Sequence, residues 1–196
     1  MSETTYQTLL LEIGKGNKKS FEIFYISISG RLFGFILRYV GSSVKAEEVF
    51  QDVMFRIWVK APLFDPEKGK AITWIFRLAG NVAKNWLDSQ KLAKNSEIPV
   101  DVGTSSEIFE KREAELELRN LNDGVISEKL ERCLSMLPED QRMSLLLRHV
   151  EGLSIEEISE ILECPEGTVK SRIFNGLKKL RLEVESRKQN ENSAGM

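Results

Sequence analysis

Apolar residues recur at steps of three and four along most of this chain, the spacing expected of helices that bury one face. Four such stretches precede residue 94, separated by Gly14, Gly16, Gly41 and the turn-rich loop 62–70. No alternating strand pattern appears in the sequence, so we predict an all-α protein whose first four helices form one bundle. The four apolar stripes are Tyr6, Leu9, Leu10 and Ile13; Phe21, Phe24, Ile28, Leu32, Phe35, Ile36 and Tyr39; Ala46, Val49, Phe50, Val53, Ile57 and Trp58; and Ile75, Leu78, Ala79, Val82 and Trp86.

Polar residues at the helix ends locate the third and fourth helices. Ser43 is placed to cap the third helix, with Glu47 and Glu48 near its positive end. That helix is expected to stop before Pro62, and the fourth is expected to begin near Thr73.

The composition changes near residue 95. Residues 97–131 carry ten Asp or Glu against four Lys or Arg, with turn-forming residues near the front of the segment. Such a composition favours a flexible tether, and a second helical module begins at about residue 126. The prediction is therefore a helical domain over 1–94, a flexible acidic linker over 95–125, a second helical domain over 126–188 and a disordered tail over 189–196.

The segment 152–180, GLSIEEISEILECPEGTVKSRIFNGLKKL, predicts two short helices joined by a tight turn. Ser154 followed by Glu157 is a capping box, so one helix should start at Ile155. Pro165 suits the first position of the next helix. That second helix is expected to bury Val169, Ile173, Leu177 and Leu180 and to present Lys170, Ser171, Phe174, Asn175 and Lys178 on its other side.

This pair of helices has two interpretations. It is a helix-turn-helix whose outer face enters the DNA major groove, or an ordinary helical hairpin with a solvated basic face. Two features favour DNA. Residues 165–188 hold seven Lys or Arg against three Asp or Glu, whereas the whole chain has a net charge of −2. Phe174 also lies among polar residues, where an aromatic side chain needs a core or a partner.

The bulk composition limits the remaining classes of function. The 196 residues are 41% hydrophobic, enough for packed cores, and no apolar run approaches the roughly 20 residues that cross a membrane. The acidic N-terminus is unlike a signal peptide. Cys133 and Cys164 suit a reducing compartment as buried, inert thiols. With one histidine, His149, we expect no metal site, no cofactor, no small-molecule substrate and no enzymatic activity.

Three stretches resemble the bacterial sigma factors of the extracytoplasmic-function (ECF) group, close to the sigma-E branch of the sigma-70 family. AEEVFQDVMFRIW (46–58) resembles the helix that docks on the polymerase clamp. FDPEKGKAITWIFRLAGNVAKNWL (64–87) resembles the element that opens and reads the −10 promoter region. LPEDQRMSLLLRHVEGLSIEEISEILECPEGTVKSRIF (137–174) resembles the −35 reader. The resemblance therefore implies sigma region 2 over 1–94 and sigma region 4 over 126–188.

The resemblance implies three sets of contact residues. Trp74 is equally well explained as core, and Arg172 and Lys178 are either phosphate anchors or solvated charges. Arg148 and His149 are weaker candidates for backbone contacts. The expected polymerase-binding residues are Glu48, Gln51, Asp52 and Arg56; the −10 residues are Phe64, Lys70, Trp74, Arg77, Asn81, Lys84 and Asn85; and the −35 residues are Thr168, Lys170, Ser171, Arg172, Phe174, Asn175 and Lys178.

The partners implied by the resemblance are core RNA polymerase, through its clamp coiled coil and flap, promoter DNA, and an anti-sigma factor, often membrane-bound. The expected location is the cytoplasm, where an anti-sigma factor would hold the chain at the inner membrane. Two other classes remain open from the residues alone. One is a stand-alone helix-turn-helix regulator that binds operators as a dimer, and the other is a module that binds single-stranded nucleic acid.

Overall fold

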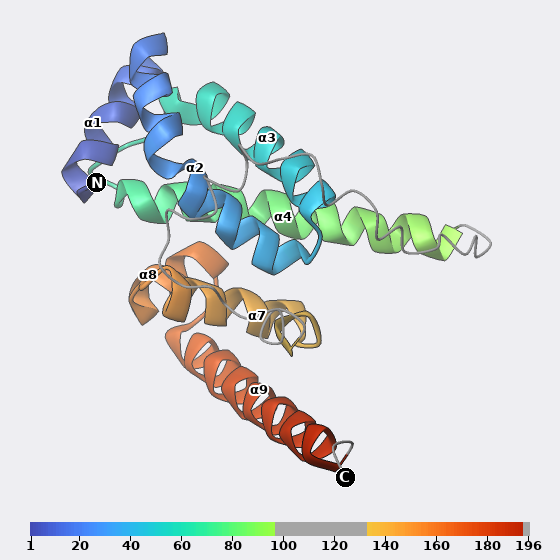
Figure 1. Ribbon diagram of the computed structural model, residues 1–196. Helices are drawn as coiled ribbons and strands as arrows, with labels where there is room; N and C mark the ends of the chain where they lie inside the picture. Colours follow the sequence, from blue (N-terminus) through green and yellow to red (C-terminus); the bar gives the residue numbers. More distant parts are fainter. Residues whose placement is uncertain (97–132, 194–196) are drawn as a thin grey trace.

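The computed structural model describes residues 1–96 and 133–193, and all regular structure in these ranges is helical (Figure 1). The predicted acidic linker and the expected start of the second domain lie almost wholly outside these ranges. The N-terminal domain contains α1 (Glu3–Gly14), α2 (Lys18–Val40), α3 (Ser43–Lys60), the 3₁₀ turn η1 (Ala61–Leu63) and α4 (Ala71–Ser96). The C-terminal domain contains α7 (Glu139–Leu145), the π-helical turn η2 (Leu146–Val150), α8 (Ile155–Leu162) and α9 (Glu166–Ser193).

Short polar side chains and one glycine set the ends of the first two helices. The Ser2 side chain accepts a hydrogen bond from the Thr5 backbone N–H and begins α1. Asn17 does the same for α2, accepting from the Ser20 N–H at 3.2 Å. Gly41, with a φ of 78°, ends α2 in the left-handed conformation that favours glycine, as predicted.

The starts of α3 and α4 differ from the prediction. Ser42, not Ser43, is the cap residue of α3, and its side chain makes no capping hydrogen bond. The fourth helix begins at Ala71, two positions before Thr73, because the Glu3 carboxylate of α1 accepts hydrogen bonds from the backbone N–H groups of Ala71 and Ile72. A carboxylate at the positive end of a helix satisfies donors that no helical carbonyl reaches. Because this cap comes from another helix, the sequence around residue 71 carries no signal for it.

The predicted apolar stripes form the core of the N-terminal domain. Phe24, Phe35 and Phe76 are fully buried, and the rings of Phe35 and Phe76 meet edge to face at 5.2 Å. Phe21, Trp58 and Trp86 differ from the prediction because they are only partly buried. The expectation that no segment could span a membrane also needs correction, since α2 is long and apolar enough by composition. One such helix is weak grounds for a membrane span, since core helices pass the same test, and α2 packs its apolar stripe into this core.

The C-terminal domain buries Ile158 and Ile161 of α8 and Val169 and Ile173 of α9. Leu177 is 41% exposed rather than buried as predicted, and Leu180 is only partly buried. The reason is that α9 approaches α7 through the buried Gly176, where an added Cβ would lie 2.8 Å from Leu145 Cδ1. The helix α9 also continues to Ser193, into the segment where we expected a disordered tail.

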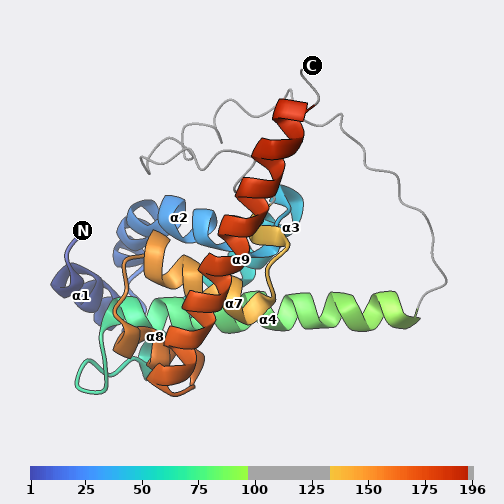
Figure 2. The ribbon, with the colours of Figure 1, turned by 90° about the horizontal axis from the view of Figure 1, so that it is seen from below.

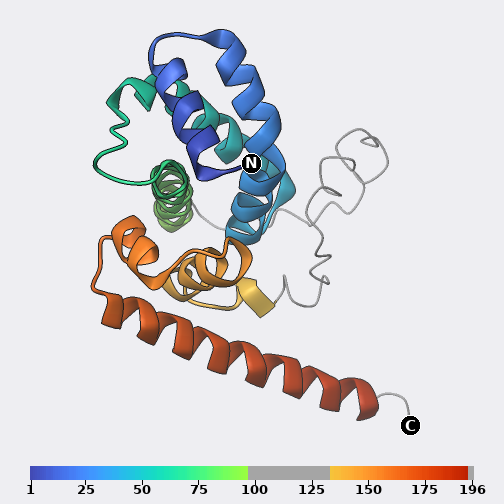
Figure 3. The same cartoon turned by 90° about the vertical axis from the view of Figure 1, so that its left-hand side faces the viewer.

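The two domains lie against each other. In Figures 1 and 3, α7 and α8 lie between α4 and α9, and Figure 2 shows α9 crossing the C-terminal domain on the side away from α4. Among the described residues, buried apolar side chains from both domains form one continuous cluster. A methyl group of Met143 on α7 would lie 3.5 Å from a Cβ at Gly80, which marks a close approach to the middle of α4.

Candidate nucleic-acid interface

The turn between α8 and α9 has the geometry of a helix-turn-helix. Both hydrogen bonds of the predicted capping box are present: Ser154 Oγ accepts from the Glu157 N–H at 3.1 Å, and Glu157 Oε2 accepts from the Ser154 N–H at 2.7 Å. The chain then turns through Glu163, which has a φ of 50°. Pro165 directly precedes the first residue of α9, one position before the place predicted for it. Arg148, a candidate for backbone contacts to DNA, donates instead to the Leu153 carbonyl at 2.8 Å. These contacts therefore fix the chain where it enters α8.

The outer face of α9 presents most of the predicted −35 residues together. Phe174 is 68% exposed at the centre of this face. The amide of Asn175 donates to Ser171 Oγ at 3.3 Å, and Lys170 pairs with Glu166 at 3.1 Å. These contacts are exposed and local, so they leave the side chains able to turn toward a base. The exposed members of the set are Lys170, Ser171, Phe174, Asn175 and Lys178.

Two members of the −35 set point elsewhere. Thr168 is half-buried in the first turn of α9. Arg172 Nη2 lies 2.6 Å from Asp140 Oδ2, and its Nη1 donates to the sulfur of Cys164 at 3.4 Å. In this arrangement Arg172 therefore joins α9 to α7 and is not available to a phosphate. The Cys133 thiol is buried, as predicted, whereas Cys164 is only half-buried.

Four cations follow one another at intervals of seven along α4 and the residue just before it: Lys70, Arg77, Lys84 and Lys91. Seven residues are almost two turns of an α-helix, so these side chains lie on one face and extend over about 30 Å. Three of them belong to the predicted −10 set, and we call the four the α4 cation row.

Every member of the α4 cation row meets an acceptor of the C-terminal domain. Lys70 lies 2.8 Å from Glu157, and Lys91 lies 2.8 Å from Glu139. The guanidinium of Arg77 donates to the Glu160 carbonyl and lies 3.8 Å from the Glu163 carboxylate. Lys84 lies 3.6 Å from Asp140. The hydrogen bond and the charge of Glu157 raise the pKa of Lys70, and the hydrogen bond to Glu139 raises that of Lys91.

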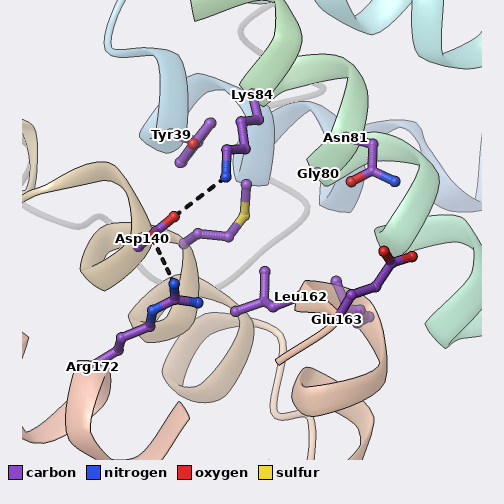
Figure 4. A pocket seen from close by; sticks show the side chains of 10 residues that line it. Tyr39, Gly80, Asn81, Lys84, Asp140, Leu162, Glu163 and Arg172 are labelled. Carbon is purple, nitrogen blue, oxygen red and sulfur yellow. Dashed lines mark hydrogen bonds and ion pairs between the residues drawn. The ribbon is translucent and has the colours of Figure 1, made fainter. Parts of the chain in front are cut away.

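A hollow of about 200 Å³ lies between the domains, at the middle of the row (Figure 4). Asn81 and Lys84 line it from α4, and Asp140 and Arg172 line it from the C-terminal domain. In Figure 4, Asp140 lies between Lys84 and Arg172 and pairs with both. One carboxylate therefore joins a predicted −10 cation to a predicted −35 cation.

The remaining −10 residues occupy two environments. Phe64 is 6% exposed and meets the half-buried Trp74 edge to face at 5.7 Å. This pair packs at the start of α4, which supports the core interpretation of Trp74, and it leaves Phe64 unable to stack on a base without moving. Asn81 and Asn85 are exposed on α4.

Two arginines join the domains by contacting buried residues of the other domain. Arg31 of α2 contacts Glu151 through Nε to Oε2 at 2.6 Å and through Nη2 to the backbone carbonyl at 2.9 Å. Burial raises the pKa of the Glu151 carboxyl, and the charge and hydrogen bond of Arg31 offset this only in part. Arg142 Nη1 donates to the Tyr39 carbonyl at 2.8 Å, and burial raises the pKa of the Tyr39 hydroxyl.

The predicted polymerase-binding residues lie on α3, away from the buried stripe. Glu48, Gln51 and Arg56 are exposed, and Arg56 pairs with Asp52 at 2.9 Å. On the same helix Phe55 and Val59 are 66% and 54% exposed. Neither residue belongs to the predicted polymerase-binding set. Their signal was available, since an aromatic and an aliphatic residue four positions apart fall outside the apolar stripe of α3.

Sequence reasoning also missed Lys91 and all the acidic partners of the α4 cation row. The interval of seven from Lys70 to Lys91 was the available signal for the fourth cation. Glu157, Glu139 and Asp140 gave no signal because a capping box and a first helical turn explain these acids locally.

Two sequence families match the chain: Sigma-70 region 2 over residues 24–92 and Sigma-70, region 4 over residues 127–180. The ECF RNA polymerase sigma-E factor of Escherichia coli (strain K12) is 36% identical over 179 residues, covering 89% of this chain and 92% of that protein. The RNA polymerase sigma-H factor of Pseudomonas aeruginosa is 30% identical over 173 residues, covering 86% of this chain and 88% of that protein.

Solved structures share the fold. The sigma factor RpoE in complex with the anti-sigma factor NepR, from Bartonella quintana, aligns with a TM-score of 0.65 at 20% identity, covering 85% of this chain and 98% of that one. CnrH in complex with the cytosolic domain of CnrY aligns with a TM-score of 0.64 at 20% identity, covering 93% of this chain and 98% of that one.

Proposed function

Because this chain belongs to the ECF sigma factors of the sigma-70 family, we propose that it binds core RNA polymerase through α3 and brings two separate DNA-reading surfaces to a promoter. In this proposal α9 reads the −35 element, and the face of α4 that begins at Lys70 binds the −10 element. The observation that carries it is that the exposed residues of α3, the basic face of α4 and the outer face of α9 lie on three different elements.

The −35 contact follows from the chemistry of the exposed α9 residues. Lys170 reaches guanine acceptors, Phe174 packs on a thymine methyl group, and Asn175 suits the two adjacent groups of adenine. Lys178, one turn further along, is placed to bind a phosphate and to fix the register.

The −10 contact depends on strand opening, because a paired duplex hides the edges through which single bases are read. Extruding a base costs a few kcal/mol, which stacking and backbone contacts recover. On α4 the cations Lys70, Arg77 and Lys84 supply phosphate contacts, and Asn81 and Asn85 supply amide groups for base edges. Phe64 and Trp74 support the loop from which this face starts.

The polymerase contact uses a surface that combines charge with apolar side chains. Glu48, Gln51 and Asp52 offer acceptors to a basic coiled coil, and charge-assisted hydrogen bonds of this kind are the stronger ones. Phe55 and Val59 add apolar area to the same helix. Apolar side chains that become buried when the complex forms contribute most of the affinity of an interface, and charged residues at its rim contribute less.

The regulatory partner in this proposal is an anti-sigma factor, as in the two solved complexes. An anti-sigma factor with a membrane anchor would hold the chain at the inner face of the membrane, and release would return it to the cytoplasm. The protein itself has no enzymatic activity in this proposal, since the chemistry of transcription belongs to the polymerase. The two functional units are sigma region 2 over 1–94 and sigma region 4 over 126–188.

Reconstituted transcription tests the proposal. The purified chain, mixed with core RNA polymerase and a library of genomic promoter fragments, should give sequence-specific run-off transcripts that core enzyme alone does not make. A double substitution of Gln51 and Asp52 by alanine should weaken association with core enzyme. Alanine at Gln7 and Glu22, which likewise removes one amide and one carboxylate on α1 and α2, should not. An absence of transcripts from every fragment, or of any association with polymerase, would rule the proposal out.

A further inference from the structure

The helix α1 contacts the chain at both ends of the loop 62–70, from which the α4 face starts. It precedes residue 24, where the match to Sigma-70 region 2 begins, so it lies outside the matched segment. Figure 1 shows α1 beside the start of α4, where the Glu3 carboxylate accepts from the backbone N–H groups of Ala71 and Ile72, the second at 3.3 Å. These are the first donors of α4, which no carbonyl of that helix can reach. Glu3 therefore fixes the point at which the loop ends.

The beginning of the same loop packs against the last residue of α1. An added Cβ at Gly14 would lie 3.1 Å from the Ala61 carbonyl oxygen and 3.2 Å from Pro62 Cα, and both of these are backbone atoms. The absence of a side chain at Gly14 therefore allows the close approach of α1 to the η1 turn. Ala61 is buried, as is Ala71 at the other end of the loop.

The helix α1 is itself held firmly on the N-terminal domain. Its apolar stripe is buried, the Tyr6 hydroxyl donates to the Ser27 carbonyl at 3.3 Å, and the Tyr6 ring meets Phe24 edge to face at 6.1 Å. Glu3 and Gly14 stand eleven residues apart on this helix, a distance of about 16 Å. One anchored helix therefore sets the positions of two points on the chain, one before the loop and one after it.

The loop between these two points has a compact turn of its own. Asp65 accepts from the Glu67 N–H at 3.0 Å, its carboxylate pairs with Lys68 at 2.9 Å, and its carbonyl accepts from the Lys68 N–H at 3.1 Å. Phe64 joins the turn to α4 through its edge-to-face contact with Trp74. Because the turn is closed on itself, a shift at either end of the loop moves it as a unit.

We propose that α1 is a positioning element for −10 recognition: Glu3 and Gly14 fix the two ends of the loop 62–70, and with them the start of the α4 face. The inference rests on the proposed function, since that function assigns Lys70 and the α4 face to the −10 strand. Glu3 acts through the backbone of α4 and is a positioning residue rather than a DNA contact. Groups that hold an extruded base bind it more tightly when they are ordered before binding, because ordering them during binding costs affinity.

The first experiment tests the Glu3 contact in the free, full-length chain. Hydrogen exchange of single amides, followed by NMR, compares wild type with Glu3→Gln, which keeps the size of the side chain but offers one acceptor oxygen in place of two. Exchange at Ala71 and Ile72 should become about fivefold faster, the ratio expected for loss of a helix cap. Glu12→Gln is the control, because it makes the same change on α1 at a carboxylate that pairs with Lys15.

The second experiment measures base opening by the holoenzyme reconstituted from core RNA polymerase and the full-length chain. The template is a genomic promoter fragment that gives a run-off transcript with wild-type protein, with one −10 base replaced by 2-aminopurine, whose fluorescence rises when it leaves the stack. The variants are Glu3→Gln and Gly14→Ala, and the controls are Glu12→Gln and Gly34→Ala. At Gly34 an added Cβ would meet the end of the flexible Arg38 side chain instead of backbone.

Both α1 variants should lower the fluorescence change about three- to fivefold, whereas both controls should match wild type. Association with core enzyme and binding of a −35 duplex should stay unchanged in all four proteins, because the outer faces of α3 and α9 are separate from the loop. Far-ultraviolet circular dichroism checks that each variant is folded. A general loss of structure would instead lower all three activities together, so the selective loss of base opening is the signature of a positioning role.

Three results would overturn the inference. Unchanged exchange at Ala71 and Ile72 in Glu3→Gln would refute the contact, and base opening at the level of the controls in both α1 variants would refute the positioning role. A parallel loss of core association, −35 binding and base opening would do the same, because misfolding would then explain it. Normal transcription by wild type beside unaffected α1 variants refutes the positioning role alone. If wild-type protein gives no transcript from any fragment, the proposed function fails, and the positioning role fails with it.

Discussion

Gly80 lies in the middle of α4, where Met143 of the C-terminal domain comes close to it. The structure therefore predicts whether replacing Gly80 by alanine raises or lowers the free energy of unfolding. An added Cβ would lie 3.5 Å from Met143 Cε and 3.7 Å from its Sδ, which is ordinary van der Waals contact. The position is helical and its φ is not positive, so alanine fits the backbone without strain. We therefore expect Gly80→Ala to stabilise the protein.

Two contributions set the size of the effect. Replacing glycine by alanine in a helix interior contributes about 1 kcal/mol. Burying one further carbon against Met143 contributes up to about 0.8 kcal/mol. The free energy of unfolding should therefore rise by about 1–2 kcal/mol, and only the second contribution depends on the contact between the domains.

Gly176 provides a matched control in α9. There an added Cβ would lie 2.8 Å from Leu145 Cδ1 and 3.3 Å from Leu145 Cγ, so the same gain in helix propensity meets overpacking, which costs about 1–3 kcal/mol. Gly176→Ala should thus be neutral or destabilising. The order of stability expected from the structure is Gly80→Ala above wild type, with Gly176→Ala at or below it.

Urea unfolding, followed by far-ultraviolet circular dichroism and by tryptophan fluorescence, measures these differences. A double-mutant cycle between Gly80→Ala and Met143→Ala isolates the contact and should give a coupling energy of about 0.5–0.8 kcal/mol. A destabilised Gly80→Ala protein would refute the reasoning, because it would mean that the space beside Met143 does not exist. If Gly80→Ala stabilises the protein without coupling to Met143, the whole increase in unfolding free energy comes from helix propensity. The contact with Met143 would then be refuted.

Three further predictions concern the C-terminal domain. Ser154→Ala should lower the free energy of unfolding by about 1 kcal/mol through loss of the cap, measured by urea unfolding, whereas Ser154→Thr should retain most of it. Burial raises the pKa of Glu157, but the hydrogen bonds from Lys70 and Ser154 outweigh burial, so the pKa is lowered from its usual value of 4.5. The ionised Glu157 therefore stabilises the protein above pH 4.5, and this stabilisation is lost as the pH falls below that value. The difference in unfolding free energy between wild type and Glu157→Gln should therefore shrink on acidification, and a constant difference would contradict the assignment. Phe174→Ala should change discrimination between matched and scrambled −35 duplexes by about 1–3 kcal/mol in a salt-controlled binding assay, and equal losses on both would make Phe174 a packing or phosphate residue.

Helical periodicity predicted the elements well because each stripe is a local pattern. The stripe of α2, from Phe24 to Tyr39, is buried as the spacing requires, and the capping box at Ser154 starts α8 where the sequence places it. The contacts of the candidate site could not be predicted in the same way. Lys70 and Glu157 are far apart in the sequence, and no local rule pairs them.

The errors in the prediction have the same cause. The start of α4 depends on Glu3, a carboxylate from another helix. The exposure of Leu177 depends on a neighbour, Gly176, that lets α7 approach closely. Arg172 fits a phosphate anchor by its position on α9, yet it pairs with Asp140 across the domain. In each case the local sequence gives the correct local preference, but a tertiary contact outweighs that preference in the folded protein.

The seven-residue interval of the α4 cation row also restricts how α4 can change in length. Each residue inserted into or deleted from a helix rotates everything beyond it by about 100°. One such change between Lys70 and Lys91 would carry the later cations off the shared face, away from carboxylates and DNA alike. Single substitutions along this helix leave the other cations in place. An insertion or deletion keeps them on one face only if it adds or removes about two whole turns.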